Sequence, residues 1–448
     1  MTRNAPFGPE ELAQVGREAA RLAWAGGMSV VKPDGQVVPI PLVAEPEVYS
    51  REELGWVAEE SFAILSGSVK LARTLLERGD PRDREALLGP FDGLEAEAMS
   101  RLFTTAPCPA VVARVDFLVP REGGHPRALE LNATIPAMPA YADLAAHSWL
   151  RAAARARGMS PRQERELVAL CGSHMEALRE TLVAFYRSRG GTKERPSIAL
   201  VARPGDAQIG ELRRLAEHFR QMGHAAENVV PAEAEPERFD ILYRHVWAHR
   251  TPPESPFARA LLEPARWVLA NPVNGLLEAK ALFARLSETA EDEGLAARAG
   301  LDERERGAAR RLPWTRLHTE VLVDRLLGDR ERFVLKRSWD YGGKSVHLGA
   351  EMEPAPWERA VREAACDRRG GGFVAQERIF AVRRPATRVA PEGISSGDLY
   401  RDISTYGGML PVHPAGSVVR AASSPIVNIL GGGGLSPVVP RDVYVRLL

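Results

Sequence analysis

The period of the hydrophobic pattern changes several times along the chain, and each change marks a different kind of structure. Over residues 1–105, apolar residues recur at i, i+3, i+4 and i+7 in two long stretches, which predicts a mostly helical N-terminal region. Residues 110–133 hold two β-rich runs joined by a link with glycine and proline, which predicts a hairpin. Helical periodicity returns over 139–157 and 161–189. We therefore expect the hairpin and these helices to form a second part, 106–195.

A further change comes at Ser197, where a strand, a glycine loop, an amphipathic helix and another strand follow one another. This order is typical of a βαβ unit and predicts a small parallel sheet over 196–275. The loop after the first strand, RPGDAQIG, lacks the GxGxxG pattern, so a dinucleotide site is not expected there. Within 276–448, strands and turns alternate around a helix predicted at 354–368. The fold class predicted by these patterns is mixed α/β.

Length and composition limit the class of protein. A chain of 448 residues is too long for one hydrophobic core, which agrees with several packed units. Its 59 acidic and 59 basic residues balance, so neither disorder nor a nucleic-acid-binding surface is indicated. Three separated cysteines without CxxC spacing argue against a disulfide framework and a thiolate zinc site. No segment resembles a signal peptide or a membrane span, so we expect a cytoplasmic protein whose partners are small molecules.

The strongest chemical signal lies in the predicted hairpin. Glu130 and Asn132 lie two residues apart and share one face of a strand, although neither residue type favours strands. Folding the hairpin about Gly123 sets Asp116 opposite Glu130 and Arg114 opposite Asn132. Two facing carboxylates repel each other unless a cation lies between them, and carboxylates with an amide oxygen suit Mg2+. The alternative is a solvent-exposed polar face with a salt bridge from Arg114.

Lysine is rare in this chain, which makes its positions informative. Arginine is the common cation, whereas lysine gives a compact point charge suited to phosphate. Lys336 ends an apolar strand and is followed by a glycine-containing loop, where backbone N–H groups and an ammonium can surround phosphate oxygens. Lys280 lies among apolar residues in a predicted helix, where a snorkelling lysine is the alternative.

Two further C-terminal features are candidates for ligand contacts. Gln376 and Glu377 end a buried-looking strand, as residues that read a purine edge would, and a strand-end ion pair with Arg378 is the alternative. The run Gly431–Gly434 fits either a backbone nest for an acyl phosphate or a plain turn.

The chain resembles the ATP-grasp superfamily in its circularly permuted form, as in the synthetase domain of glutathionylspermidine synthase, through the ordered motifs R-x-D, E-x-N, NP…K, VLK…GGK, QERI and VVRAASSPIVN…GGGG. In conventional members the metal-binding strands follow the nucleotide-binding lysines, whereas here they precede them. The resemblance covers roughly residues 110–440. It implies an ATP-grasp fold in permuted order, with 196–275 as a pre-ATP-grasp-like domain and 276–448 as the nucleotide-binding subdomains.

The resemblance also implies roles for the residues that match the family's motifs. The Mg2+ ligands that bridge the ATP phosphates would be Asp116, Glu130 and Asn132. The lysines that contact phosphates and base would be Lys280 and Lys336, and the phosphate-covering loop would hold Gly342, Gly343 and Lys344. The hinge strand that reads adenine would supply Gln376 and Glu377. The transferred phosphoryl group would be neutralised by Arg114 and Arg420. The loop reads DYGGKS where the family more often has Gly-Arg-Glu-Gly, which leaves the role of Lys344 open.

The activity implied by the resemblance is an ATP- and Mg2+-dependent carboxylate–amine ligase. A carboxylate would be phosphorylated to an acyl phosphate with release of ADP, and an amine from an amino acid, peptide or polyamine would displace phosphate. Two other classes share the nucleotide residues: a small-molecule phosphotransferase and a non-catalytic ATP-binding protein. We expect no nucleic-acid or membrane partner, and a homodimer is the commonest expectation for assembly.

Overall fold

A seven-stranded sheet lies at the centre of the molecule. The computed structural model describes residues 7–105, 108–340, 343, 345–410, 417–429 and 432–448, with the backbone alone over 100–105. The strands of the central sheet run in the order β15-β3-β18-β17-β16-β5-β6 and are antiparallel except for the β18–β3 pair. Their bounds are β15 Arg383–Ala390, β3 Leu42–Val43, β18 Gly434–Ser436, β17 Ser417–Ala422, β16 Gly393–Gly407, β5 Ala113–Leu118 and β6 Arg127–Asn132.

The N-terminal part is mostly helical, as the pattern predicted, but it also contains strands that the pattern did not predict. Besides α1 (Pro9–Ala25) and α2 (Arg51–Arg78), it forms four short strands, of which β3 enters the central sheet. The other three are β1 Ser29–Val31, β2 Val37–Pro39 and β4 Glu47–Tyr49. Strands of two or three residues are too short to show a period of two, so the pattern of apolar residues did not reveal them.

Helices cover both faces of the central sheet. On one face α2 packs against odd-numbered positions of the sheet, including Val115, Phe117 and Val419. On the other face α1 and α5 (Pro139–Ala156) pack together and against Val418. Because side chains alternate along a strand, even-numbered residues of β5, β16 and β17 share this second face. The candidate site lies on that face, beyond the part that the two helices cover.

A smaller sheet is parallel, as the βαβ pattern predicted. Its order is β10-β9-β7-β8, with β7 Ile198–Ala202, β8 Ala226–Val229, β9 Ile241–His245 and β10 Leu269–Ala270. The connecting helix α8 (Ile209–Gln221) has the expected amphipathic form, with Leu212, Leu215 and Phe219 buried. The helical stretch predicted at 161–189 is divided into α6 (Pro161–Cys171) and α7 (His174–Ser188). Gly172, with φ of +89°, separates them in a conformation that favours glycine.

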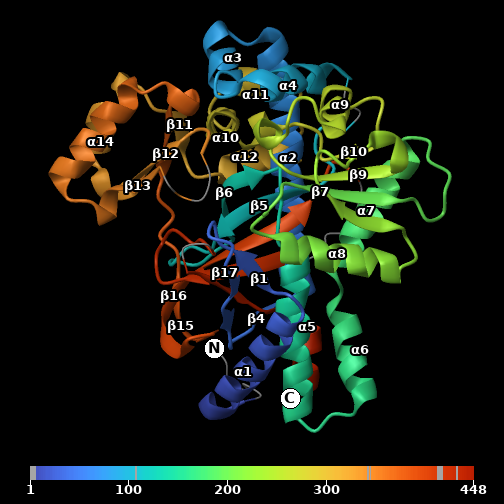
Figure 1. The fold of residues 1–448 in the computed structure, drawn as a ribbon. Coiled ribbons are helices and arrows are strands. Elements are labelled where there is room, and N and C mark those ends of the chain that lie inside the picture. Colours follow the sequence, from blue (N-terminus) through green and yellow to red (C-terminus); the bar gives the residue numbers. More distant parts are fainter. Residues whose placement is uncertain (1–6, 106–107, 341–342, 344, 411–416, 430–431) are drawn as a thin grey trace.

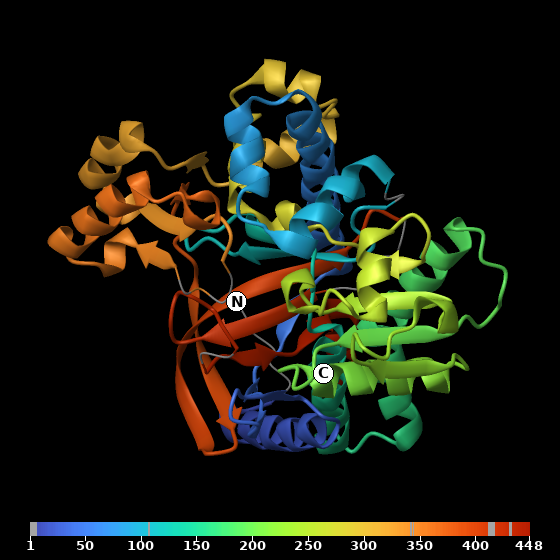
Figure 2. The same ribbon diagram turned by 45° about the horizontal axis from the view of Figure 1, so that its top comes forward.

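A third sheet, antiparallel, has the order β11-β14-β12-β13. Its strands are β11 Thr315–Leu317, β14 Phe373–Glu377, β12 Phe333–Arg337 and β13 Val346–Leu348. It packs on α13 (Val323–Gly328) and on α14 (Pro354–Cys366), which closely matches the predicted helix. Figures 1 and 2 show this sheet, in orange, on the opposite side of the central sheet from the parallel sheet, in green.

The remaining described helices and one further strand lie outside the three larger sheets. The helices among them are α3 Pro81–Leu88, α4 Gly93–Thr105, α9 Pro256–Leu262, α10 Lys280–Glu288, α11 Glu293–Arg298, α12 Glu303–Arg311 and α15 Arg441–Tyr444. Strand β19 (Val438–Pro440) pairs in parallel with β4 and so joins the two ends of the chain. Among the residues described, none of the helices has both the length and the apolar character needed to cross a membrane.

Candidate functional site

The β5–β6 hairpin has the predicted register. Arg114 pairs with Asn132 and Asp116 pairs with Glu130, and an irregularity follows directly after Asp116. The solvent-exposed alternative does not hold for β5, since Arg114 is 7% exposed and Asp116 is 1% exposed. Strand β16 covers the other edge of β5, so these polar side chains lie inside the sheet's packed face.

Buried charges are paired at this point of the sheet. Arg114 donates from Nε to Asp116 Oδ1 at 2.8 Å and from Nη2 to Oδ2 at 3.0 Å. Arg420, on β17, donates from Nη2 to Asp116 Oδ2 at 2.9 Å and to Asp402 Oδ2 at 2.5 Å. Burial alone would raise the pKa of Asp116, but Arg114 and Arg420 lower it to about 2. Two arginines and two aspartates therefore form a neutral, interlocked quartet.

The side-chain oxygens of Glu130 and Asn132 are better placed to bind a cation than those of Asp116. Both oxygens of Asp116 already accept from nitrogen donors, including Asn132 Nδ2 at 3.2 Å. The Glu130 side chain is 35% exposed and has Lys280 Nζ at 3.5 Å. A carboxylate and an amide oxygen facing a cavity fit the chemistry of a hard cation that keeps water and phosphate ligands. No cluster of three His, Cys, Asp or Glu side chains suited to a metal occurs in the described part of the chain, so Asn132 and ligand oxygens would have to complete the shell.

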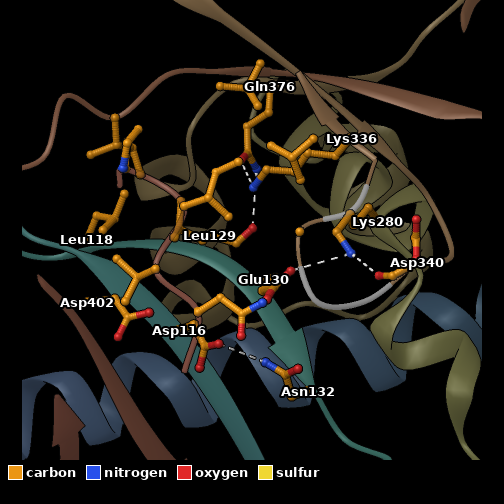
Figure 3. Close-up of a pocket in the computed structure, with 18 of the residues that line it drawn as sticks. Asp116, Leu118, Leu129, Glu130, Asn132, Lys280, Lys336, Asp340, Gln376 and Asp402 are labelled. Carbon is orange, nitrogen blue, oxygen red and sulfur yellow. Dashed lines mark hydrogen bonds and ion pairs between the residues drawn. The ribbon is translucent and has the colours of Figure 1, made fainter. Parts of the chain in front are cut away.

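Lys336 and Gln376 meet at the other end of the site. Lys336 on β12 donates to Gln376 Oε1 on the neighbouring strand β14 at 2.7 Å, and Gln376 Nε2 donates to Thr315 Oγ1 at 3.1 Å. Lys336 is 9% exposed, and burial lowers its pKa to about 8 although Glu130 opposes the shift. An ammonium and an amide, both buried, thus lie side by side in the cavity wall, as the labelled side chains in Figure 3 show.

One cavity joins the two ends. It is lined by the quartet, by Glu130 and Asn132, and by Lys280, Lys336 and Gln376. Its apolar walls come from the central sheet (Leu118, Leu129), from the antiparallel sheet (Val334, Leu348) and from Ile379, which follows β14. Figure 3 shows Lys280 between Glu130 and Asp340, and Nζ donates to the Asp340 carbonyl oxygen at 3.1 Å. The apolar walls with a few convergent polar groups are typical of a small-molecule site.

Lys280 differs from its predicted place inside a helix, because it is the first residue of α10. The turn before it holds Glu278, a partly buried carboxylate that accepts from Ala133 N at 2.7 Å and from Thr134 N. These bonds join the end of β6 to the start of α10 and so fix Lys280 beside Glu130. Glu278 also lines the cavity, as do Trp247 and Trp339, and the sequence patterns identified none of the three.

The remaining predicted residues divide into two groups. Gly343 and Glu377 line the cavity, and the Glu377 carboxylate lies 3.4 Å from Arg332 Nη2. The ion-pair alternative named Arg378, but Arg378 pairs with Glu351 instead. Gly342 and Lys344 lie outside the described residues.

The glycine run near the C-terminus forms a turn in its described part. Gly432 N donates to Ile429 O at 3.1 Å and Gly433 N donates to Asn428 O at 3.0 Å, so these amides already have backbone partners. This arrangement favours the plain-turn alternative for Gly432 and Gly433. Gly431 lies outside the described residues.

Comparison with solved structures relates this architecture to a known fold. The chain matches the structure of a glutathione synthetase-like effector, GSS30, from Globodera pallida in its apo form, with a TM-score of 0.61. The match covers 97% of this chain and 98% of that chain at 14% sequence identity, a level at which the likeness shows the fold alone. No family model and no curated protein matches the sequence. The mixed α/β class is thus confirmed, and the fold is like that of a glutathione synthetase-like protein.

Proposed function

We propose that the protein is an ATP-dependent carboxylate–amine ligase that forms an amide through an acyl phosphate. The observation that carries this proposal is the single cavity in which Lys336 and Gln376 lie at one end and the Arg114–Arg420 quartet at the other. A nucleotide needs an apolar slot for its base and cations along its phosphates, and the cavity offers these features in that order. The glutathione synthetase-like fold supports the same reading.

The base end would bind adenine. Gln376 presents an amide, and Val334 and Leu348 provide apolar surface beside it. Lys336 and Lys280 would then bind phosphate oxygens, for which a lysine ammonium is a suitable point charge. Glu377 and the Gly343 backbone lie at the cavity wall, and we assign them to the base and phosphate contacts respectively.

Glu130 and Asn132 would hold Mg2+, which when bound neutralises charge on the triphosphate. Asp116 as a third ligand stays a prediction, because nitrogen donors occupy both of its oxygens. We also assign Asp116 a second role: its carboxylate holds Arg114 and Arg420 in place beside the cavity.

Arg114 and Arg420 would act on the reacting groups. The substrate carboxylate oxygen bonds to the γ-phosphorus while the bond from that phosphorus to the β-phosphate oxygen breaks, which gives an acyl phosphate and ADP. The amine nitrogen then bonds to the acyl carbon, the carbon–oxygen bond to phosphate breaks, and phosphate and a proton leave. Fixed guanidinium groups stabilise the charge that develops on the phosphoryl oxygens without reorganising.

The test is an assay with trapping. The protein is incubated with Mg-ATP and pools of amino acids, peptides or polyamines, with and without hydroxylamine. ADP release that depends on a carboxylate, together with a hydroxamate, is the expected result. A stable phosphorylated product would instead identify a phosphotransferase, and thermal stabilisation by ATP without ADP formation would identify a non-catalytic binder. Either of these two outcomes would overturn the ligase proposal.

A further inference from the structure

Met138 has an unusual backbone conformation close to the site. Its φ is +91° and its ψ is 8°, and it is the one non-glycine residue with positive φ in the described part of the chain. In this region Cβ crowds the backbone, so an L-residue with a side chain adopts it only where its surroundings impose it. Met138 is also 5% exposed, at the N-cap of α5.

The residue before it connects this conformation to Arg114. The Ala137 carbonyl oxygen accepts from Arg114 Nη1 at 3.0 Å and from the Tyr406 hydroxyl at 2.9 Å. Together with the two bonds to Asp116, this contact engages three of the five guanidinium N–H groups. One N–H on each Nη is left for a ligand, and the Ala137 carbonyl helps to fix the direction in which both point.

The residue that holds Met138 comes from a helix that packs on the parallel sheet. Glu211, on α8 of the parallel-sheet unit, accepts from Met138 N at 2.9 Å through Oε2 and from Ala140 N at 3.2 Å through Oε1. Glu211 is 1% exposed, and the two amides that it accepts from belong to the N-cap of α5 and to the second residue of that helix. An acidic side chain that only capped a helix would not require the residue at the cap to take a left-handed conformation, since caps are ordinarily extended.

We infer that Glu211 is a positioning residue for Arg114. By binding the Met138 and Ala140 amides, it holds Met138 left-handed and so directs the Ala137 carbonyl at the guanidinium. This inference rests on the proposed function insofar as Arg114 acts on the phosphoryl group. Through α8, the parallel-sheet unit would thus help to orient Arg114, although Glu211 itself would touch no substrate.

A double-mutant cycle tests the inference. In Glu211→Gln, the amide must direct its NH2 group at one of the two backbone N–H groups, so Met138 is expected to relax to negative φ. We expect acyl phosphate formation to slow by at least tenfold while the affinity for ATP stays within twofold. Met138→Gly removes the steric cost of positive φ, so the loss caused by Glu211→Gln should fall to threefold or less in that background. An equal loss in both backgrounds would show that Glu211 only stabilises α5 and would overturn the inference.

A second background tests whether the effect passes through Arg114. In Arg114→Lys the guanidinium is absent, so Glu211→Gln should cause little further loss; a full additional tenfold loss would overturn the inference. Should Glu211→Gln fail to fold, Glu211→Asp, which is one methylene shorter, takes its place with the same expectations.

A crystal structure of the Glu211 variant gives a readout that needs no activity. We expect the Ala137 oxygen to lie beyond hydrogen-bond distance of Arg114 Nη1, and an unchanged contact would overturn the inference. If the wild-type protein forms no acyl phosphate, the proposed function fails, and the crystal structure still decides whether Glu211 positions Arg114.

Discussion

Arg420 reaches across an intervening strand to Asp116. The two residues lie on β17 and β5, with β16 between them, and Nη2 of Arg420 is 2.9 Å from Oδ2 of Asp116. They are 304 residues apart in the chain. This contact completes the quartet, and both proposed phosphoryl-binding arginines therefore bind one carboxylate. We expect a substitution of Asp116 to disturb both of them.

Asp116→Asn is expected to lower both stability and turnover. The substitution keeps the shape of the side chain but removes the charge that two buried arginines share, and breaking a buried pair costs about 3–5 kcal/mol. We expect the free energy of unfolding in urea to fall by about 3 kcal/mol and acyl phosphate formation to fall at least a hundredfold. A control is Asp398→Asn, an exposed residue of the β15–β16 hairpin. Stability equal to that of the control would contradict the central role of this carboxylate.

Glu130→Gln is expected to weaken the dependence of ATP binding on Mg2+ rather than the fold. Glu130 is partly exposed, and its carboxylate lies 3.5 Å from Lys280 Nζ. An amide is a poorer ligand for a hard cation than a carboxylate, so the Mg2+ concentration that half-saturates ATP binding should rise at least tenfold. The matched control is Glu122→Gln in the exposed loop of the same hairpin. An unchanged Mg2+ requirement would remove Glu130 from the metal site.

Because the pKa of Lys336 is lowered, we expect nucleotide binding to depend on pH. Burial lowers its pKa to about 8 in the absence of ligand, and a bound phosphate would raise it again. Above pH 8 the free protein carries a neutral Lys336, so ATP binding must take up a proton: about half a proton at pH 8, and nearly one at pH 9, where affinity falls about tenfold per pH unit. Calorimetry in two buffers of different ionisation enthalpy measures this uptake.

The control for the pH prediction is Lys336→Met. This variant should bind ATP more weakly at pH 7 and should show no proton uptake beyond that of the nucleotide itself. Wild-type protein that binds ATP without taking up protons between pH 7 and pH 9 would show that Lys336 does not contact the phosphates.

The hairpin was predictable because its information is local. Arg114 and Asp116 alternate with apolar residues, and Glu130 and Asn132 do the same. A slip by two residues would leave all four polar side chains on one face, and a slip by one would turn the apolar face of a strand outward. The βαβ order of the parallel sheet is local in the same sense. Patterns of this kind survive in a single sequence because each lies within one or two consecutive elements.

The rest of the site depends on contacts between distant segments. The engagement of Asp116 by Arg420 follows from the order of strands in the central sheet, which no local period encodes. Glu278 lies in a short turn among apolar residues, and only the fold brings it to the end of β6. Glu211 looks like an ordinary acidic residue in the first turn of an amphipathic helix. Tertiary pairing, and not propensity, decided these positions.

Gly343→Ala is expected to weaken ATP binding through the backbone. Gly343 has φ of +73° and lines the cavity, and an added Cβ would lie 2.6 Å from Ile426 Cγ2. Both the conformation and the contact oppose a side chain, so we expect the affinity for ATP to fall about tenfold, because a left-handed non-glycine residue costs about 1–2 kcal/mol. Gly397→Ala is the control, since Gly397 has ordinary φ and no neighbour within 4 Å of an added Cβ. Adding Ile426→Ala removes the contact but not the strain, so it should recover only part of the affinity. Full affinity in Gly343→Ala alone would show that this position does not approach the phosphates.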